Sequence, residues 1–176
     1  MTLLVKHGLS RKAESQQASS PRGLDDIPGL NEGETVSLPQ LPSLRGEAVS
    51  LSGTSSDYLL CAFISTECAG CAQDTKFWKN LHEEAAKRGV SFYLISLDRD
   101  RSQVEKFAKA YEFDDLNILY DPDLQTIREF KISFVPQYVL LMKSGEVVRR
   151  WSGLRRPEVT GKNDSLSQYF VSKSNP

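Results

Sequence analysis

Two cysteines three residues apart are the feature of this sequence that points most directly to chemistry. The motif Cys68-Ala69-Gly70-Cys71 follows the apolar run Tyr58–Ile64 and opens a segment of helical periodicity. Cysteines spaced in this way on a first helical turn are close enough to form a disulfide. The thiolate is the attacking species in disulfide exchange, and the N–H groups and positive end of a helix stabilise it. We therefore expect Cys68 to be the nucleophile and Cys71, one turn further in, to be the resolving cysteine.

Metal binding is one alternative role for the two cysteines, and it depends on which other ligands the chain offers. Zinc usually takes four protein ligands, and Cys61, His7 and His82 are not spaced to complete such a site. We therefore expect no metal and no other cofactor. Two readings stay open beside disulfide exchange: a thiol peroxidase in which Cys68 reacts with peroxide, and an interaction module without catalytic activity.

Composition restricts the class of protein. The chain has 176 residues and a net charge of -1, which suits one domain and argues against a dedicated nucleic-acid binder. No apolar run approaches the roughly 18–20 residues of a membrane span. All 16 aromatic residues lie at or after Tyr58, so we expect residues 1–33 to be a flexible polar leader and residues 34–176 to form the domain. The leader shows no secretory signal, and it is interpreted either as a cytoplasmic terminus or as a stalk whose membrane anchor precedes this chain.

Strand and helix patterns alternate along the domain. The sequence predicts an edge hairpin of residues 35–38 and 48–51, buried strands at 58–64 and 90–97, a short strand at 118–120 and a final hairpin of 137–142 and 146–151. Helices are predicted at 68–88, from a cap at Asp100 or Ser102 to Tyr111, at 123–130 and at 163–173. This order predicts an α/β fold with a central mixed sheet flanked by helices.

Residues of about 35–153 resemble the TlpA-like thiol-disulfide oxidoreductases of the thioredoxin fold, which are related to the peroxiredoxins. The matching segments are FISTECAGC, the inserted strand and helix ILYDPDLQTIREF, and FVPQYVLLMKSGEVVRRWSG. The resemblance implies that Pro136 is a cis proline facing the cysteine pair and that the Val135 backbone binds a substrate polypeptide. Thr66 and Glu67, which precede the first cysteine, are expected to contact the substrate as well.

The sequence also departs from its relatives. Glu67 stands where they usually carry Trp, and its charge should oppose thiolate formation at the neighbouring cysteine. Peroxiredoxins place Pro and Thr where this chain has Cys61 and Ser65, which disfavours the peroxidase. Ala62 replaces the buried acid of thioredoxins, so another group should move the proton of Cys71.

Asp74, three residues after Cys71, is our candidate for that proton transfer. The alternative is that Asp74 only complements the positive helix end. Cys61 is expected to be a buried, inert thiol. The remaining aspartates near the strand ends, Asp98, Asp100, Asp121 and Asp123, are expected to cap helices and turns rather than to bind a metal.

The sequence thus predicts a thiol-disulfide oxidoreductase that reduces or exchanges disulfides in partner proteins and is served by an upstream redox donor. The resemblance implies a role in cytochrome or metalloenzyme maturation. No nucleic acid is expected as a partner, and a membrane only through an anchor outside this chain. The site would then lie on the outer side of the bacterial inner membrane, and otherwise in the cytoplasm.

Overall fold

A five-stranded mixed sheet forms the centre of the computed structural model, which describes residues 29–153 and Leu166. The strand order is β5-β4-β3-β6-β7, in which β3 pairs parallel with β4 and antiparallel with β6. The strands are β3 (Tyr58–Ile64), β4 (Val90–Ser96), β5 (Ile118–Tyr120), β6 (Gln137–Met142) and β7 (Val147–Ser152). The α/β class and the mixed sheet predicted from the sequence are confirmed.

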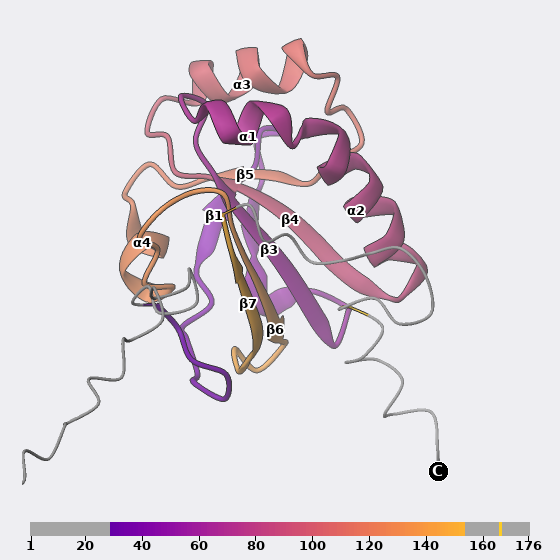
Figure 1. Cartoon of the computed structure of the whole chain (residues 1–176), viewed down its shortest axis with the longest axis vertical. Coiled ribbons are helices and arrows are strands. Elements are labelled where there is room, and N and C mark those ends of the chain that lie inside the picture. The colour runs from indigo at the N-terminus through magenta and orange to yellow at the C-terminus, as the bar shows by residue number, and fades with distance from the viewer. Residues whose placement is uncertain (1–28, 154–165, 167–176) are drawn as a thin grey trace, which may run out of the picture.

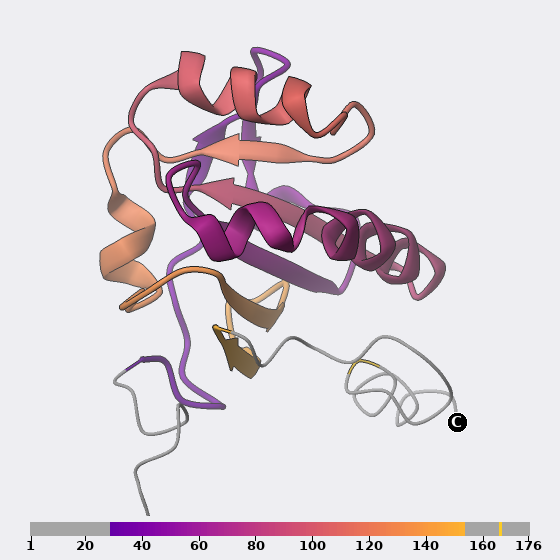
Figure 2. The ribbon, with the colours of Figure 1, turned by 45° about the horizontal axis from the view of Figure 1, so that its top comes forward.

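Helices cover both faces of the sheet. Helices α1 (Ala69–Gln73), α2 (Thr75–Lys87) and α3 (Arg101–Ala110) lie over one face, and α4 (Gln125–Glu129) lies on the other side (Figures 1 and 2). Strand β3 alternates between two separate cores: Leu60 and Ala62 face α2 and α3, while Leu59 and Cys61 face the opposite side. Every residue from Leu59 to Ile64 is fully buried. This two-sided burial is the reason for the uninterrupted apolar run of β3.

A small hairpin precedes the main sheet, but its first strand is not the predicted one. Strand β1 (Gln40–Pro42) pairs with β2 (Ala48–Ser50), and a 3-10 turn, η2 (Leu51–Gly53), follows. The predicted strand at 35–38 instead runs beside the β6–β7 turn, where Val36 N donates to Gly145 O at 3.0 Å. A Cβ at Gly145 would lie 2.3 Å from Val36 O, so this close approach requires glycine. Gly46, with a φ of 96°, lies in a short turn between β1 and β2. Because the turn is short, the residues that pair with β2 are those just before it, Gln40–Pro42, and not the predicted residues 35–38.

The predicted single helix at 68–88 is divided into α1 and α2. Asp74 lies between them with φ -91° and ψ 1°, and its backbone N–H donates to Cys71 O, three residues back. Its side chain turns into the core and accepts a hydrogen bond from Tyr138. Aspartate favours helix ends because its short polar side chain competes with the helical backbone. The periodicity of the apolar residues continues across the break, so the sequence pattern alone did not reveal it.

The other predicted elements that fall on described residues are present, with ends that differ from the predicted ones by at most two residues. Helix α4 begins at Gln125 rather than 123, because Leu124 adopts a φ of 53° and Asp121 accepts hydrogen bonds from the first backbone N–H groups of α4. Asp100 caps α3 as predicted. The predicted helix at 163–173 lies outside the described residues. Of the predicted leader, residues 29–33 are described, and Leu30 is already buried in the core; the boundary at residue 33 stays a prediction.

Candidate active site

The two motif cysteines lie at the junction between β3 and α1. Cys68 is the N-cap of α1, and its Sγ accepts a hydrogen bond from Cys71 N at 3.1 Å. Cys68 is half-buried, whereas Cys71 is fully buried on the inner side of the helix. All three cysteines of the chain carry free thiols. The geometry therefore presents one thiol toward the surface and holds the second behind it.

Burial is the main influence on the inner thiol. It raises the pKa of Cys71, and the hydrogen bond with Cys68 and the nearby charge of Asp74 raise this pKa further. A backbone hydrogen bond to Ser65 acts in the opposite direction. The Cys71 thiol thus holds its proton firmly unless a neighbouring group accepts it.

Asp98, at the end of β4, holds the loop that leads into Cys68. One carboxylate oxygen accepts from Ser65 Oγ at 3.1 Å, and the other accepts from Thr66 N at 2.8 Å and from Ser96 Oγ. The sequence predicted that Asp98 caps a helix or a turn, whereas its carboxylate joins the loop after β4 to the loop after β3. Asp98 therefore determines where the backbone just before the nucleophile lies.

The loop before β6 faces the half-buried thiol of Cys68. The Val135–Pro136 peptide bond is cis, as the resemblance implied, and Cys68 Sγ donates to Val135 O at 3.6 Å. Pro136 is buried, and its carbonyl accepts from Gly153 N at 2.9 Å. Val135 is half-buried beside the thiol. The structure thus brings together Cys68 and the loop that the sequence assigned to substrate binding.

A buried hydrogen-bond chain lies behind the cysteine pair. Asp74 is 5% exposed, and its Oδ2 accepts from Tyr138 Oη at 3.2 Å. The Tyr138 oxygen in turn accepts from Trp78 Nε1 at 3.0 Å, and both aromatic residues are fully buried. Asp74 was proposed from the sequence, but no role in the site was assigned to Tyr138 or Trp78. The available signal was a hydroxyl-bearing residue within the otherwise apolar part of β6, two positions after Pro136.

The remaining predicted residues lie at or near the pair. Glu67 is exposed and Thr66 is half-buried, both in the turn that precedes Cys68. Cys61 is fully buried on the opposite face of the sheet, where burial raises its pKa to about 12. It is too well enclosed to take part in the site. Within the described part of the chain, no three His, Cys, Asp or Glu side chains gather as a metal site would require.

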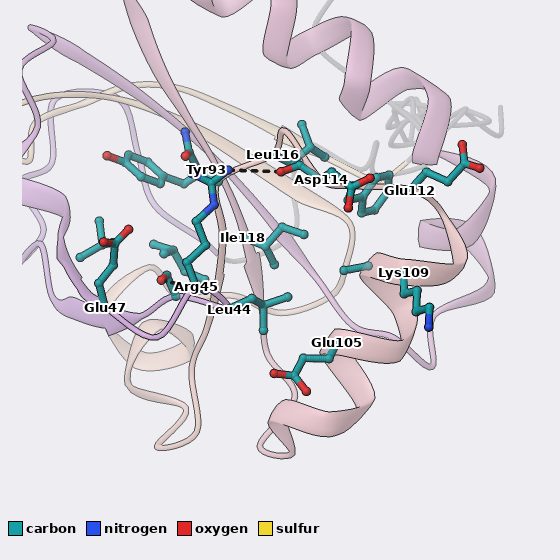
Figure 3. Close-up of a pocket in the computed structure, with 16 residues that line it drawn as sticks. Leu44, Arg45, Glu47, Tyr93, Glu105, Lys109, Glu112, Asp114, Leu116 and Ile118 are labelled. Atoms are coloured by element: carbon teal, nitrogen blue, oxygen red, sulfur yellow. Dashed lines mark hydrogen bonds between the residues drawn. The ribbon is translucent and has the colours of Figure 1, made fainter.

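A hollow of about 820 Å³ lies elsewhere, between the β1–β2 hairpin, β5 and α3 (Figure 3). Arg45 crosses it and donates from Nη2 to Asp114 O at 3.2 Å. Side chains of both charges line it together with Leu44 and Ile118. Because the cysteines and the Val135–Pro136 loop do not line this hollow, it is separate from the site.

The chain and its fold are similar to known proteins. A family model described as Redoxin matches residues 29–165. The thioredoxin domain of a thiol-disulfide oxidoreductase from Bacteroides vulgatus superposes with a TM-score of 0.64 and 20% identity, over 83% of this chain and 99% of that one. A thiol-disulfide oxidoreductase from Bacteroides fragilis gives 0.61 and 22%, over 78% and 98%.

StoA from Bacillus subtilis is similar over 66% of this chain and 88% of its own, with a TM-score of 0.59 and 19% identity. These likenesses establish the thioredoxin-like fold. No curated protein sequence matches the chain. None of the helices in the described ranges is both long enough and apolar enough to cross a membrane.

Proposed function

The chain belongs to the Redoxin family, and on this premise we propose that it is a thiol-disulfide oxidoreductase that acts on protein disulfides through Cys68 and Cys71. The observation that carries the proposal is the asymmetry of the pair. Cys68 is half-exposed, accepts a backbone hydrogen bond and lies against the Val135–Pro136 loop, while Cys71 is fully buried one turn behind it. A nucleophile must meet its client, whereas a resolving thiol needs to reach only the nucleophile.

The proposed reaction has two displacement steps. The Cys68 thiolate attacks one sulfur of a partner disulfide, the partner S–S bond breaks, and the leaving thiolate takes up a proton. Cys71 then gives up its proton and attacks Cys68 Sγ, which breaks the mixed disulfide and releases the second partner thiolate to be protonated. The partner gains two electrons and two protons, and the chain is left with a Cys68–Cys71 disulfide. An upstream donor of two electrons must restore the dithiol.

Asp74 is proposed as the group that accepts and returns the Cys71 proton. Its negative charge contributes to the raised pKa of Cys71, which makes the unaided thiol a poor nucleophile. A nearby carboxylate can take this proton as the attack begins and give it back in the reverse direction. The competing role is electrostatic compensation of the helix end alone, which is worth about 0.3–1 kcal/mol.

Val135, Pro136, Thr66 and Glu67 are proposed to form the surface on which the client docks. They flank the half-buried thiol of Cys68 from the loop before β6 and from the turn before α1. The resemblance extends the proposal to clients in cytochrome or metalloenzyme maturation, and to a location outside the inner membrane if an anchor precedes the chain.

Trapping of mixed disulfides tests the division of labour. Cys71→Ser should accumulate covalent complexes with disulfide-containing proteins, because the first attack remains and the resolving attack is lost. Cys68→Ser should accumulate none, and Cys61→Ala should behave like the wild type. Complexes should disappear on reduction, and their clients can be identified by mass spectrometry.

Other outcomes would contradict the proposal. Equal trapping by both serine variants, or trapping through Cys61, would remove the assigned roles. Turnover of hydrogen peroxide without exchange on protein disulfides would favour the peroxidase. A native protein that shows no two-electron transition in a glutathione titration would favour an interaction module.

A further inference from the structure

Tyr138 occupies a position directly behind the cysteine pair. It lies on β6 opposite Ala62 of β3 in the sheet register, and its side chain belongs to the same core as Cys71 and Trp78. The ring packs edge-on against Phe77, with ring centroids 6.0 Å apart. Because Ala62 is small and apolar, the polar groups beneath the cysteines come from β6 and from the α1–α2 junction instead of β3.

The direction of the hydrogen bonds in this chain is determined by the indole. Trp78 Nε1 has only a proton to donate, so the Tyr138 oxygen must act as the acceptor at 3.0 Å. The single Tyr138 proton then points to Asp74 Oδ2 at 3.2 Å. A carboxylate oxygen is a pure acceptor and fits this arrangement, whereas a proton on Oδ2 would meet the proton of the tyrosine.

We propose that Tyr138 is a positioning residue for Asp74: its hydroxyl, itself oriented by Trp78, holds the carboxyl group at the place where it exchanges a proton with Cys71. This inference rests on the proposed function and deepens it. Asp74 is nearly buried, so the oxygens of its carboxyl group depend on protein groups for hydrogen bonds. The hydrogen bond from Tyr138 satisfies one of these oxygens and restricts rotation of the side chain.

Few groups that can gain or lose a proton lie near the carboxyl group of Asp74. From α1 these are the thiols of Cys68 and Cys71, and from β6 the hydroxyl of Tyr138. Helix α2 contributes the neutral indole of Trp78, and β3 contributes Ala62, which cannot titrate. A change in the pH profile on substitution of Tyr138 therefore concerns the carboxyl group of Asp74 and the two thiols.

The test separates the two displacement steps. The reduced protein is mixed with oxidised glutathione, and the formation and resolution of the Cys68–glutathione disulfide are followed by rapid acid quench between pH 4 and 9. Tyr138→Phe should slow resolution about tenfold, since hydrogen bonds to charged groups typically correspond to one or two powers of ten. The dependence of the resolution rate on pH should change as well, whereas loss of a hydroxyl that only fills space would leave it as in the wild type. Alkylation of Cys68 by iodoacetamide should be unchanged.

Asp74→Asn and the double variant show whether the effect passes through the carboxylate. Asp74→Asn should slow resolution more strongly than Tyr138→Phe, and adding Tyr138→Phe to it should change the rate less than twofold. Tyr93→Phe is the matched control, since it removes the hydroxyl of a tyrosine that packs in the core on the opposite face of the sheet. It should leave both steps and the pH profile as in the wild type.

Several results would overturn the inference without touching the proposed function. One is a pH profile of resolution that is unchanged in Tyr138→Phe. Another is that Tyr138→Phe slows resolution by the same factor with and without Asp74→Asn. A third is that Tyr93→Phe slows resolution as much as Tyr138→Phe does. If the wild-type protein forms no Cys68–Cys71 disulfide at all, the proposed function itself fails.

A second measurement serves if Tyr138→Phe does not fold. In the wild type the Tyr138 hydroxyl proton should give a slowly exchanging NMR resonance, and this resonance should move upfield in Asp74→Asn because a neutral acceptor binds it more weakly. A resonance that is unaffected by the substitution refutes the contact.

Discussion

Removing the Asp98 carboxylate should loosen the loop before Cys68. Asp98→Ala deletes an acceptor shared by Ser65 Oγ, Thr66 N and Ser96 Oγ. The most costly loss is the Thr66 N–H, a part-buried backbone donor at 2.8 Å that is left without its partner. Each hydrogen bond to a charged group contributes about 1.5–3 kcal/mol. Because the hydroxyls of Ser65 and Ser96 can turn to other acceptors, we expect a total loss of about 3 kcal/mol.

Urea denaturation measures this loss. With a slope of about 2 kcal/mol per molar urea, the midpoint of Asp98→Ala should fall by about 1.5 M. Asp98→Asn retains one acceptor oxygen and should lose less than half as much. Hydrogen exchange at Thr66 N should be accelerated at least tenfold in the alanine variant and far less in the asparagine variant.

The control for these variants is Asp123→Ala, at an exposed position where a change of no more than about 0.5 kcal/mol is expected. Equal midpoints for Asp98→Ala and Asp98→Asn would refute the argument, because they would show that the carboxylate oxygens do not hold the loop. Unchanged protection of Thr66 N in Asp98→Ala would do the same.

Two further predictions concern buried polar groups outside the reacting pair. Burial raises the Cys61 pKa from 9.0 to about 12, so the contribution of this thiol to stability is intact below pH 9 and falls above it as the unfolded thiol ionises. Between pH 8 and 10.5, the free energy of unfolding of Cys61→Ala should therefore fall by about 2 kcal/mol less than that of the wild type. Equal losses in urea denaturation would contradict this. The amide of Gln137 is fully buried, and among the described residues it has no hydrogen-bond partner. Gln137→Met should thus raise the free energy of unfolding by about 1 kcal/mol, and a lowered melting temperature would show that the amide is satisfied after all.

Local patterns were sufficient for the cysteine pair and for most elements. The apolar run of β3, followed by a cysteine motif with helical periodicity, placed Cys68 at a strand–helix junction without any knowledge of the tertiary structure. The apolar run of a buried strand and the capping residue of a helix each lie within one short segment, so both can be recognised in the sequence. The predicted burial of Cys61 succeeded for the same reason.

Only the tertiary structure decided how the site is supported. The contact between Asp98 and Thr66 joins residues 32 apart, that between Asp74 and Tyr138 joins residues 64 apart, and that between Cys68 and Val135 joins residues 67 apart. These contacts depend on the order β4-β3-β6, which places three separate segments side by side. A hydrogen bond needs its partners within about 3 Å and correctly oriented. The spacing of residues along the chain does not determine which distant segments come this close, so these contacts could not be predicted from the sequence.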